Sequence, residues 1–292
     1  MACMLALRTS PAGFPMAPSA QEWEALSPAE RAEVTAALPG EVTDAEIAMP
    51  EGERHFRAKI RALEALRGYF ARQRRRIYLA AEMPTYYPLE PRFAPDLFAV
   101  LDADDTVRDK WVVSAEGNKG LDWVLEVHVG GDRRKDAERN VARYARLGIP
   151  EYFLYDGASN RLSVYRLASP DARTYTAVLP NHGFYESRVL GLNVQVDKDR
   201  LRFYAGTALL LESEELITRL EELCDDAQRR RTEEARLREE AEQRRDEETQ
   251  RRQEAEQRLD EEARLRKEAE QRRDEAEQEI SRLRAELERL RR

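Results

Sequence analysis

The sequence predicts an α/β domain, in which helices flank a mixed β-sheet, followed by a long C-terminal helix of coiled-coil type. Three observations lead to this prediction. Residues 121–156 follow the order strand, glycine turn, helix and strand, which is the pattern of a parallel β-α-β unit. Short apolar segments separated by Pro, Gly and Asn stand on both sides of this unit. From about residue 207 the pattern is continuously helical; after Leu223 nearly every residue is Glu, Arg, Gln or Ala, and sequence blocks recur at multiples of seven residues.

The N-terminal part is expected to contain little regular structure. Residues 1–20 are rich in Pro, Ala and Ser, a composition typical of a disordered segment. Residues 21–50 form a short helical lead-in, because Ser27–Glu30 has the pattern of a capping box with proline in the first turn. That helix is expected to end near Leu38, and Thr43–Glu46 repeats the capping signal weakly.

The predicted globular domain, residues 51–206, begins with an amphipathic helix at about residues 53–73. Its apolar residues Ile60, Leu63, Leu66 and Phe70 are three and four positions apart, so they form one stripe that needs a sheet to cover it. Strands are then expected at 76–83 and 96–101, joined by a proline-containing loop at 84–95, and an acidic loop at 102–109 leads to a return strand opening at Trp111.

The central β-α-β unit follows at residues 121–156. Odd positions of 121–129 are apolar and even positions include Glu126 and His128, an alternation typical of a strand with one apolar face. Glu126 and His128 must therefore point to the same side. Gly130–Gly131 permits a tight turn, and the helix that follows ends before the second strand at 151–155. A right-handed crossover places the end of the first strand beside the first turns of this helix. The polar strand face is thus the predicted site.

Beyond the central unit, the sequence predicts antiparallel strands that extend the sheet. Apolar segments alternate with turn residues, and Asp197–Asp199 has the character of a hairpin turn. The expected strands are 162–167, 174–179, 184–189, 192–196 and 201–204.

Residues 207–292 form the predicted coiled-coil tail, although its apolar seam is thin. One heptad column is mostly Ala and Glu and the other mostly Arg, so the middle is expected to be a solitary helix held by Glu/Arg pairs four residues apart. A sustained apolar seam is found only near the end, at Ala276, Ile280, Leu283, Leu287 and Leu290. We expect this tail to join two copies of the chain, as a helix on the order of 130 Å long.

The composition excludes several classes of protein. The formal net charge is −8, and Asp225 to Arg292 holds 23 acidic against 20 basic residues, so an avid nonspecific DNA binder is not indicated. Any nucleic-acid contact must use a local basic patch. Cys3 and Cys224 lack the spacing of metal ligands, which suits a reducing compartment. No apolar run approaches the ~20 residues needed to cross a bilayer, so we expect a cytoplasmic protein without membrane contact.

Asp96 and Glu126 are the residues that predict chemistry. They lie on strands expected to be neighbours, and paired carboxylates are the hard oxygen ligands that Mg²⁺ prefers. A water bound to such an ion can attack a phosphodiester. Two positions along a strand return to the same face, so His128 is expected to point toward the metal and the scissile phosphate.

The sequence also resembles the Uma-type branch of the PD-(D/E)XK nuclease superfamily over roughly residues 55–204. The resemblance is carried by Pro95–Asp96, Leu125-Glu126-Val127, Asp136, the stretch Tyr144 to Tyr152, and Asp156. It implies a restriction-endonuclease-like fold and metal-dependent hydrolysis of DNA. It also implies that Asp96 and Glu126 bind Mg²⁺ or Mn²⁺ with help from the Val127 carbonyl, and that Asp136 shapes the site.

One position departs from the superfamily pattern. The usual lysine stands two residues after the acidic strand residue or, in this branch, on the following helix, and these positions hold His128 and Asn140. Three interpretations stay open. His128 acts as a general base or orients water; Lys135 in the first turn of the helix supplies the charge; or the fold is catalytically inactive and serves as a scaffold through its tail.

Other polar residues have structural and functional interpretations side by side. His55 lies where this branch often has a histidine near the site, yet a lone helical histidine is more often structural, and His182 occupies a solvated turn. A basic run on the central helix either guides phosphates or forms an ordinary solvated face. Its members are Arg133, Arg134, Lys135, Arg139 and Arg143.

Overall fold

A computed structural model describes residues 8–41, 52–129 and 133–290, with the backbone alone for 133–137, 288 and 290. The chain divides into two compact units, Met1–Ile217 and Thr218–Arg292.

The first unit is built on a six-stranded mixed sheet with the order β10-β9-β8-β7-β5-β3. The central strands β7 and β8 are parallel, and every other neighbouring pair in this sheet is antiparallel. The helix α4, Arg133–Arg146, connects the two parallel strands, which confirms the predicted β-α-β unit. The strands are β3 Ile77–Ala80, β5 Leu97–Leu101, β7 Trp123–His128, β8 Glu151–Asp156, β9 Arg161–Leu167 and β10 Tyr175–Val178.

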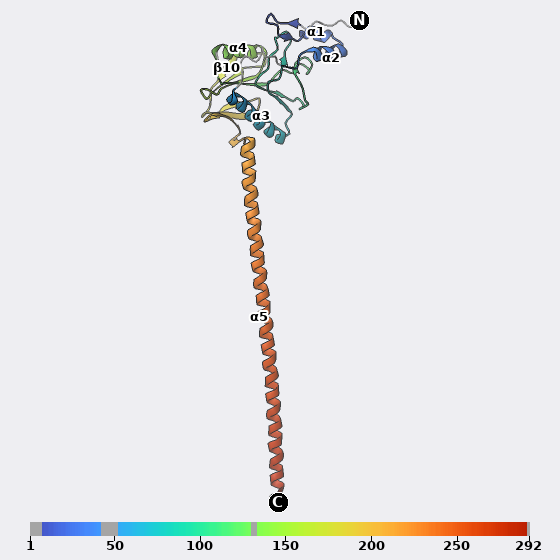
Figure 1. The fold of residues 1–292 in the computed structure, drawn as a ribbon, viewed down its shortest axis with the longest axis vertical. Helices are drawn as coiled ribbons and strands as arrows, with labels where there is room; N and C mark the ends of the chain where they lie inside the picture. The colour runs from blue at the N-terminus through green and yellow to red at the C-terminus, as the bar shows by residue number, and fades with distance from the viewer. Residues whose placement is uncertain (1–7, 42–51, 130–132, 291–292) are drawn as a thin grey trace. The chain divides into compact units, whose positions relative to one another are not determined.

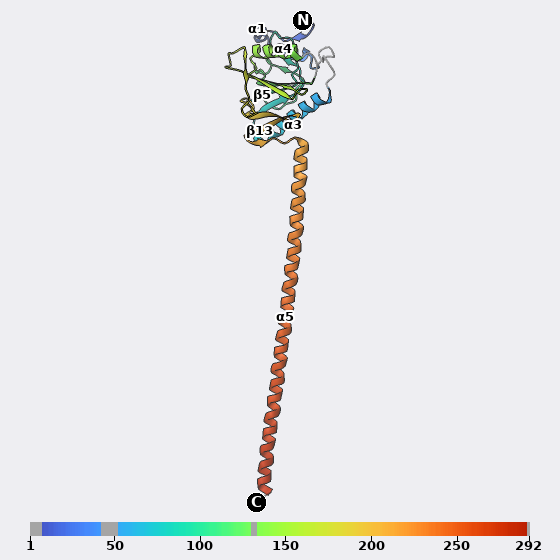
Figure 2. The ribbon, with the colours of Figure 1, turned by 90° about the vertical axis from the view of Figure 1, so that its left-hand side faces the viewer.

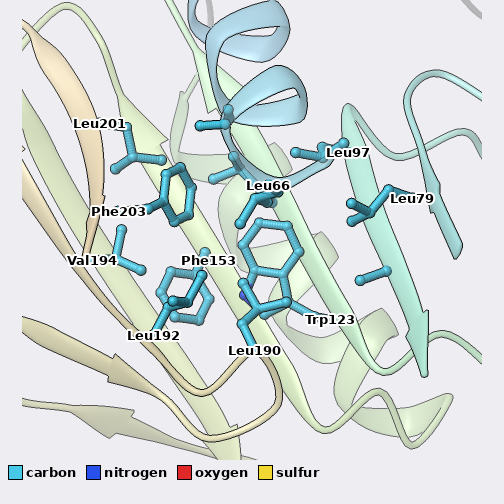
Figure 3. Packing of buried hydrophobic residues seen from close by; sticks show 14 of the residues in the cluster. Leu66, Leu79, Leu97, Trp123, Phe153, Leu190, Leu192, Val194, Leu201 and Phe203 are labelled. Carbon is cyan, nitrogen blue, oxygen red and sulfur yellow. The ribbon is translucent and has the colours of Figure 1, made fainter. Parts of the chain in front are cut away.

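The helix α3, Glu53–Gln73, covers one face of this sheet, and its bounds agree with the predicted amphipathic helix. Leu66 lies beside Trp123 of β7 and Phe153 of β8 in the larger hydrophobic core (Figure 3). The opposite face carries a second core that includes Tyr144 of α4 and Tyr152 of β8. Alternate residues of β7 thus enter different cores, as the strand pattern requires.

The last strands do not extend the central sheet, so the sequence prediction is wrong for them. They form a separate four-stranded antiparallel sheet with the order β11-β12-β13-β14. Leu192, Val194, Leu201 and Phe203 of this sheet enter the core beneath α3, and burial of these apolar residues favours folding over the face instead of adding to the edge (Figure 3). The strands are β11 Tyr185–Ser187, β12 Leu192–Asp197, β13 Arg200–Ala205 and β14 Ala208–Leu209.

The N-terminal segment contains regular structure from residue 8, where composition predicts disorder. Strands β1, Arg8–Thr9, and β2, Pro15–Met16, form an antiparallel pair. Ala17 is fully buried in a small core with Leu38. Ser19 is one of the residues whose composition predicts disorder, but its side chain caps the helix that follows.

Two short helices follow, and both begin with a capping box. They are α1, Ala20–Ala25, capped by Ser19, and α2, Pro28–Ala37, capped by Ser27. The second confirms the predicted helix of the lead-in. The weaker signal at Thr43–Glu46 lies outside the described residues.

Part of the loop predicted at 84–95 is a short strand, and it pairs with the return strand predicted at Trp111. Thr85–Tyr86, β4, pairs in parallel with Trp111–Val112, β6. The acidic loop between them is held by Arg108, which contacts Asp104 and Glu116. These two strands form a small sheet of their own instead of joining the central one.

The helix α5, Ser213–Leu290, is continuous over 78 residues (Figures 1 and 2). It begins later than the expected residue 207 because residues 208–209 form β14. Pairs four residues apart, such as Glu248 with Arg252 and Glu262 with Arg266, line it as predicted. No helix in the described ranges is long and apolar enough to cross a membrane.

Candidate active site

The structure brings Asp96 and Glu126 together, as the predicted strand order requires. Leu97 of β5 stands opposite Leu125 of β7, so the residues just outside this pair are neighbours. The Asp96 backbone N–H approaches Glu126 Oε2 at 3.4 Å. The Val127 backbone N–H donates to Asp96 Oδ2 at 2.7 Å, which fixes the carboxylate against β7.

Helix α3 adds two basic side chains to this pair. The Nε2 atom of His55 lies 3.1 Å from Asp96 Oδ2, and Lys59 Nζ lies 3.7 Å from Asp96 Oδ1. His55 is only 7% exposed and Lys59 only 3% exposed. Lys59 also forms an ion pair with Glu82. One turn of α3 thus places an imidazole and an ammonium on one carboxylate.

Neither of these residues was assigned to the site from the sequence. As a lone helical histidine, His55 is expected to be structural, and no sequence motif singles out Lys59. A signal for both was present, because His55 and Lys59 continue at spacings of three and four the stripe formed by Ala62 and Leu66. Polar residues on the buried stripe of an amphipathic helix need partners. In this protein Asp96 is the partner they share.

Helix α4 supplies the group that faces the second carboxyl. The Tyr144 hydroxyl donates a hydrogen bond to Glu126 Oε1. The Tyr144 ring packs edge-on against Tyr152, with centroids 5.1 Å apart. Tyr144 stands three positions after Val141, a helical spacing that fits its buried ring but does not reveal the bond made by its hydroxyl.

The two carboxyls have opposite electrostatic surroundings. Burial favours a neutral Asp96, but the bond to His55, the Val127 N–H and the Lys59 charge hold the pKa of Asp96 below its ordinary value. Burial and the nearby Asp96 charge raise the pKa of Glu126 well above its ordinary value. Burial also raises the pKa of Tyr144, which therefore remains a hydroxyl donor. Asp96 therefore ionises more readily than Glu126.

The donor chemistry of this pair fits a magnesium-type ion. Carboxylate oxygens on adjacent strands are hard ligands, and Mg²⁺ commonly uses one or two carboxylates and keeps several waters. Among the described side chains, no group of three or more His, Cys, Asp or Glu is arranged to hold a metal. Such an ion would therefore be held by few protein ligands. The role expected of the Val127 carbonyl stays a prediction.

Of the other residues predicted from the sequence, His128 and Arg143 are described by the structure, and the side chains of Lys135 and Asp136 are not. His128 stands two positions after Glu126 on β7, opposite Asp156 of β8, and is partly buried. The side chains of Lys135 and Asp136 lie outside the described part of the chain. Several features mark Arg143 as structural, since it donates to Glu90 at 2.9 Å and its guanidinium lies 4.3 Å from the centre of the Phe93 ring.

Two comparisons with known proteins find similarity to this chain. Residues 21–197 match the model of the family Uma2, described as "Putative restriction endonuclease". No curated protein matches the chain. A crystal structure from Anabaena variabilis ATCC 29413, titled as a putative nuclease belonging to DUF820, is similar at 14% sequence identity. The similarity covers 49% of this chain and 75% of that one, with a TM-score of 0.38.

Proposed function

Because the chain belongs to the Uma2 family, we propose that its nuclease-like domain, residues 51–206, hydrolyses phosphodiester bonds of DNA with the help of a divalent cation. The observation that carries the proposal is the juxtaposition of Asp96 and Glu126 on neighbouring strands, with His55 and Lys59 of α3 placed against Asp96. Two carboxylates beside a buried cation can recruit a metal ion and a phosphate to one place.

In this proposal Asp96 and Glu126 hold Mg²⁺ or Mn²⁺, and the Val127 carbonyl assists. The bound ion would supply an activated water and neutralise charge on the phosphate. His55 and the Val127 N–H keep Asp96 oriented and ionised. Tyr144 orients Glu126 through its hydroxyl. Fixed ligands of this kind reduce the reorganisation needed when substrate binds.

Lys59 is our candidate for the positive charge that the superfamily usually takes from a lysine on the strand or the next helix. Its ammonium is held at Asp96 by α3, so it stands beside the carboxylate pair without needing residue 128 or 140. Lys135 and His128 are the competing candidates from the sequence. An ammonium at this place would stabilise the charge that develops on the phosphate during cleavage.

The test is nicking of supercoiled plasmid in Mg²⁺ and in Mn²⁺. We expect Asp96→Asn and Glu126→Gln each to abolish nicking, because each removes a metal-binding carboxylate without changing side-chain size. Asp105→Asn is the matched control, since Asp105 is exposed in the loop after β5 and should nick at the wild-type rate. Cleavage that survives in either site variant would contradict the assignment.

A second function is favoured by one specific observation, the replacement of the usual lysine by His128 and Asn140. On this alternative the domain is a catalytically inactive nuclease fold that acts as a scaffold through its tail. Wild-type protein that neither binds a divalent cation nor nicks plasmid would favour it.

We also propose that the chain forms a homodimer through α5 and that DNA is its substrate.

A further inference from the structure

The two heptad columns of α5 that would form the seam of a coiled coil carry apolar groups near the two ends of the helix. The described Ile and Leu side chains of these two groups range from 50% exposed for Ile280 to 56% exposed for Leu287, so about half of each is open to a partner. The first group is Ile217, Leu220, Cys224 and Ala227, and the second is Ala276, Ile280, Leu283 and Leu287.

Between these ends, the same two columns are charged and are sorted by sign. One column, which continues Ile217 and Cys224, carries arginines with a single leucine, Leu259. The other, which continues Leu220 and Ala227, alternates glutamate with alanine. The arginines are Arg231, Arg238, Arg245, Arg252, Arg266 and Arg273, and the glutamates are Glu234, Glu248 and Glu262.

This sorting distinguishes the two ways in which a second copy of α5 can pair with the first. In a parallel, in-register pair each column faces itself, so the six arginines would each face arginine and the three glutamates would each face glutamate. In an antiparallel pair each column faces the other, so every arginine faces glutamate, alanine or leucine. Like charges held together in a seam are destabilising, and opposite charges set partner and orientation.

We propose that α5 pairs with a second copy of itself in the antiparallel orientation. In this register the apolar group at the start of each helix faces the apolar group at the end of the other. Leu220 then meets Leu287 of the second copy, Cys224 meets Leu283, and Ala227 meets Ile280. In the same register, Glu234 meets Arg273 and Arg245 meets Glu262, while Arg238 and Arg252 cross alanines. The apolar residues at both ends are covered, and no layer of the seam brings like charges together.

The orientation determines where the two helices begin. At 1.5 Å per residue, the starts of the paired helices would lie on the order of 100 Å apart, at opposite ends of the pair. This inference rests on the proposed self-association through α5, and it does not depend on the nuclease activity.

Cys224 gives a direct test by cross-linking. In the full chain, Cys3→Ser leaves Cys224 as the single cysteine. We expect mild oxidation of this protein to give no covalent dimer, because the two Cys224 residues lie far apart in an antiparallel pair. Adding Leu283→Cys should give a covalent dimer on a non-reducing gel. Ala276→Cys, which lies one heptad away in the same column, is the matched control and should not cross-link.

Each other outcome would contradict a stated part of the inference. Cross-linking through Cys224 alone indicates a parallel pair, which keeps the self-association and overturns the orientation. Cross-linking that occurs only with Ala276→Cys would mean that Cys224 faces residue 276 of the second copy instead of residue 283, which overturns the proposed register. A monomer by light scattering overturns both the self-association and the orientation, and leaves the nuclease proposal to its own test.

A second measurement covers the case in which Leu283→Cys weakens the pair. A spin label at Glu240→Cys, with both native cysteines changed to serine, lies outside the two seam columns. In the antiparallel register, the two labels should be about 45 Å apart by pulsed electron resonance, given the helical rise of 1.5 Å per residue. A distance under about 30 Å would indicate the parallel pair.

Discussion

Lys59 is a buried ammonium that lies between the carboxylates of Glu82 and Asp96. A buried charge is costly unless it is paired, and both carboxylates contribute to stabilising it there. Glu82 contributes from a backbone with a φ of 52°, a left-handed conformation that is uncommon for a residue with a side chain. Conformations of this kind often occur at functional sites.

We predict that Lys59→Met lowers the plasmid-nicking rate by roughly 10²-fold, because a positive charge beside the phosphate is removed. Lys59→Arg should retain part of the rate, since it keeps the charge with different geometry. Lys135→Met is the comparison that discriminates between the two lysines. Equal loss in both variants, or loss only with Lys135→Met, would contradict the role given to Lys59.

We predict that Tyr144→Phe lowers the free energy of unfolding by about 1–2 kcal/mol, because Glu126 Oε1 loses its donor in a mostly buried position. Urea unfolding measures this change. Tyr204→Phe on β13 is the control and should change stability by less. If both variants unfold at the same urea concentration as wild type, the bond from Tyr144 contributes nothing to stability.

At the scale of single residues, the sequence predicts the two carboxylates of the site but not the basic residues that contact them. Asp96 and Glu126 follow from strand alternation and strand order, both of which are local patterns. His55 and Lys59 reach Asp96 from a helix some 40 positions earlier in the chain, and their partner is set by how α3 packs on the sheet. A lone sequence does not contain that packing, so the polar residues on the buried stripe of α3 were the available clue.

Glu151 joins two elements that are distant in sequence. It begins β8, is 1% exposed, and accepts hydrogen bonds from Arg166, from the Ser187 hydroxyl and from the Arg188 backbone N–H. Its carboxylate thereby ties the central sheet to β11, the first strand of the second sheet. A single buried carboxylate with three donors thus helps to hold the last strands across the face of the first sheet.

We predict that Glu151→Ala destabilises the first unit by about 3–5 kcal/mol, since it leaves Arg166 without its buried partner. Chemical denaturation of the full chain, followed by tryptophan fluorescence, measures the loss. Glu186→Ala is the matched control, because Glu186 lies on β11 but is exposed. A change under about 1 kcal/mol in Glu151→Ala would contradict this role.

At the scale of elements, local patterns predicted where helices and strands form but not which strands pair. Alternation identified the segments that became β11, β12 and β13, yet it could not show that they leave the central sheet. That outcome depends on Glu151 and on the apolar residues that enter the core beneath α3. In the same way, Trp111 lies in a predicted strand, and its partner β4 lies in a segment that has the appearance of a loop.

For the molecule as a whole, α5 is the feature that sequence patterns describe most fully. The heptad repeat and the ion pairs four residues apart both follow from residue spacing along one helix, and the structure shows one continuous helix. What remains a proposal is the partner of its apolar ends. The structure of one chain does not contain this partner. The argument for a second, antiparallel copy comes from the charges of the two seam columns.

We predict that Leu287→Glu makes the full chain monomeric at micromolar concentration, because it places a carboxylate opposite Leu220 in the proposed pair. Light scattering measures the mass. Leu265→Glu is the matched control, since Leu265 is equally exposed on α5 but lies outside the two seam columns. Leu287→Glu that remains dimeric would contradict the role of the terminal seam.

The central claim is that Asp96 and Glu126 form a metal-dependent nuclease site, and calorimetric titration of Mn²⁺ tests it most directly. We expect the wild-type chain to bind the ion and to nick plasmid in the same buffer, and Glu126→Gln to do neither while keeping the wild-type unfolding midpoint. Wild-type protein that binds no divalent cation, or Glu126→Gln that binds and nicks as wild type does, would contradict the account.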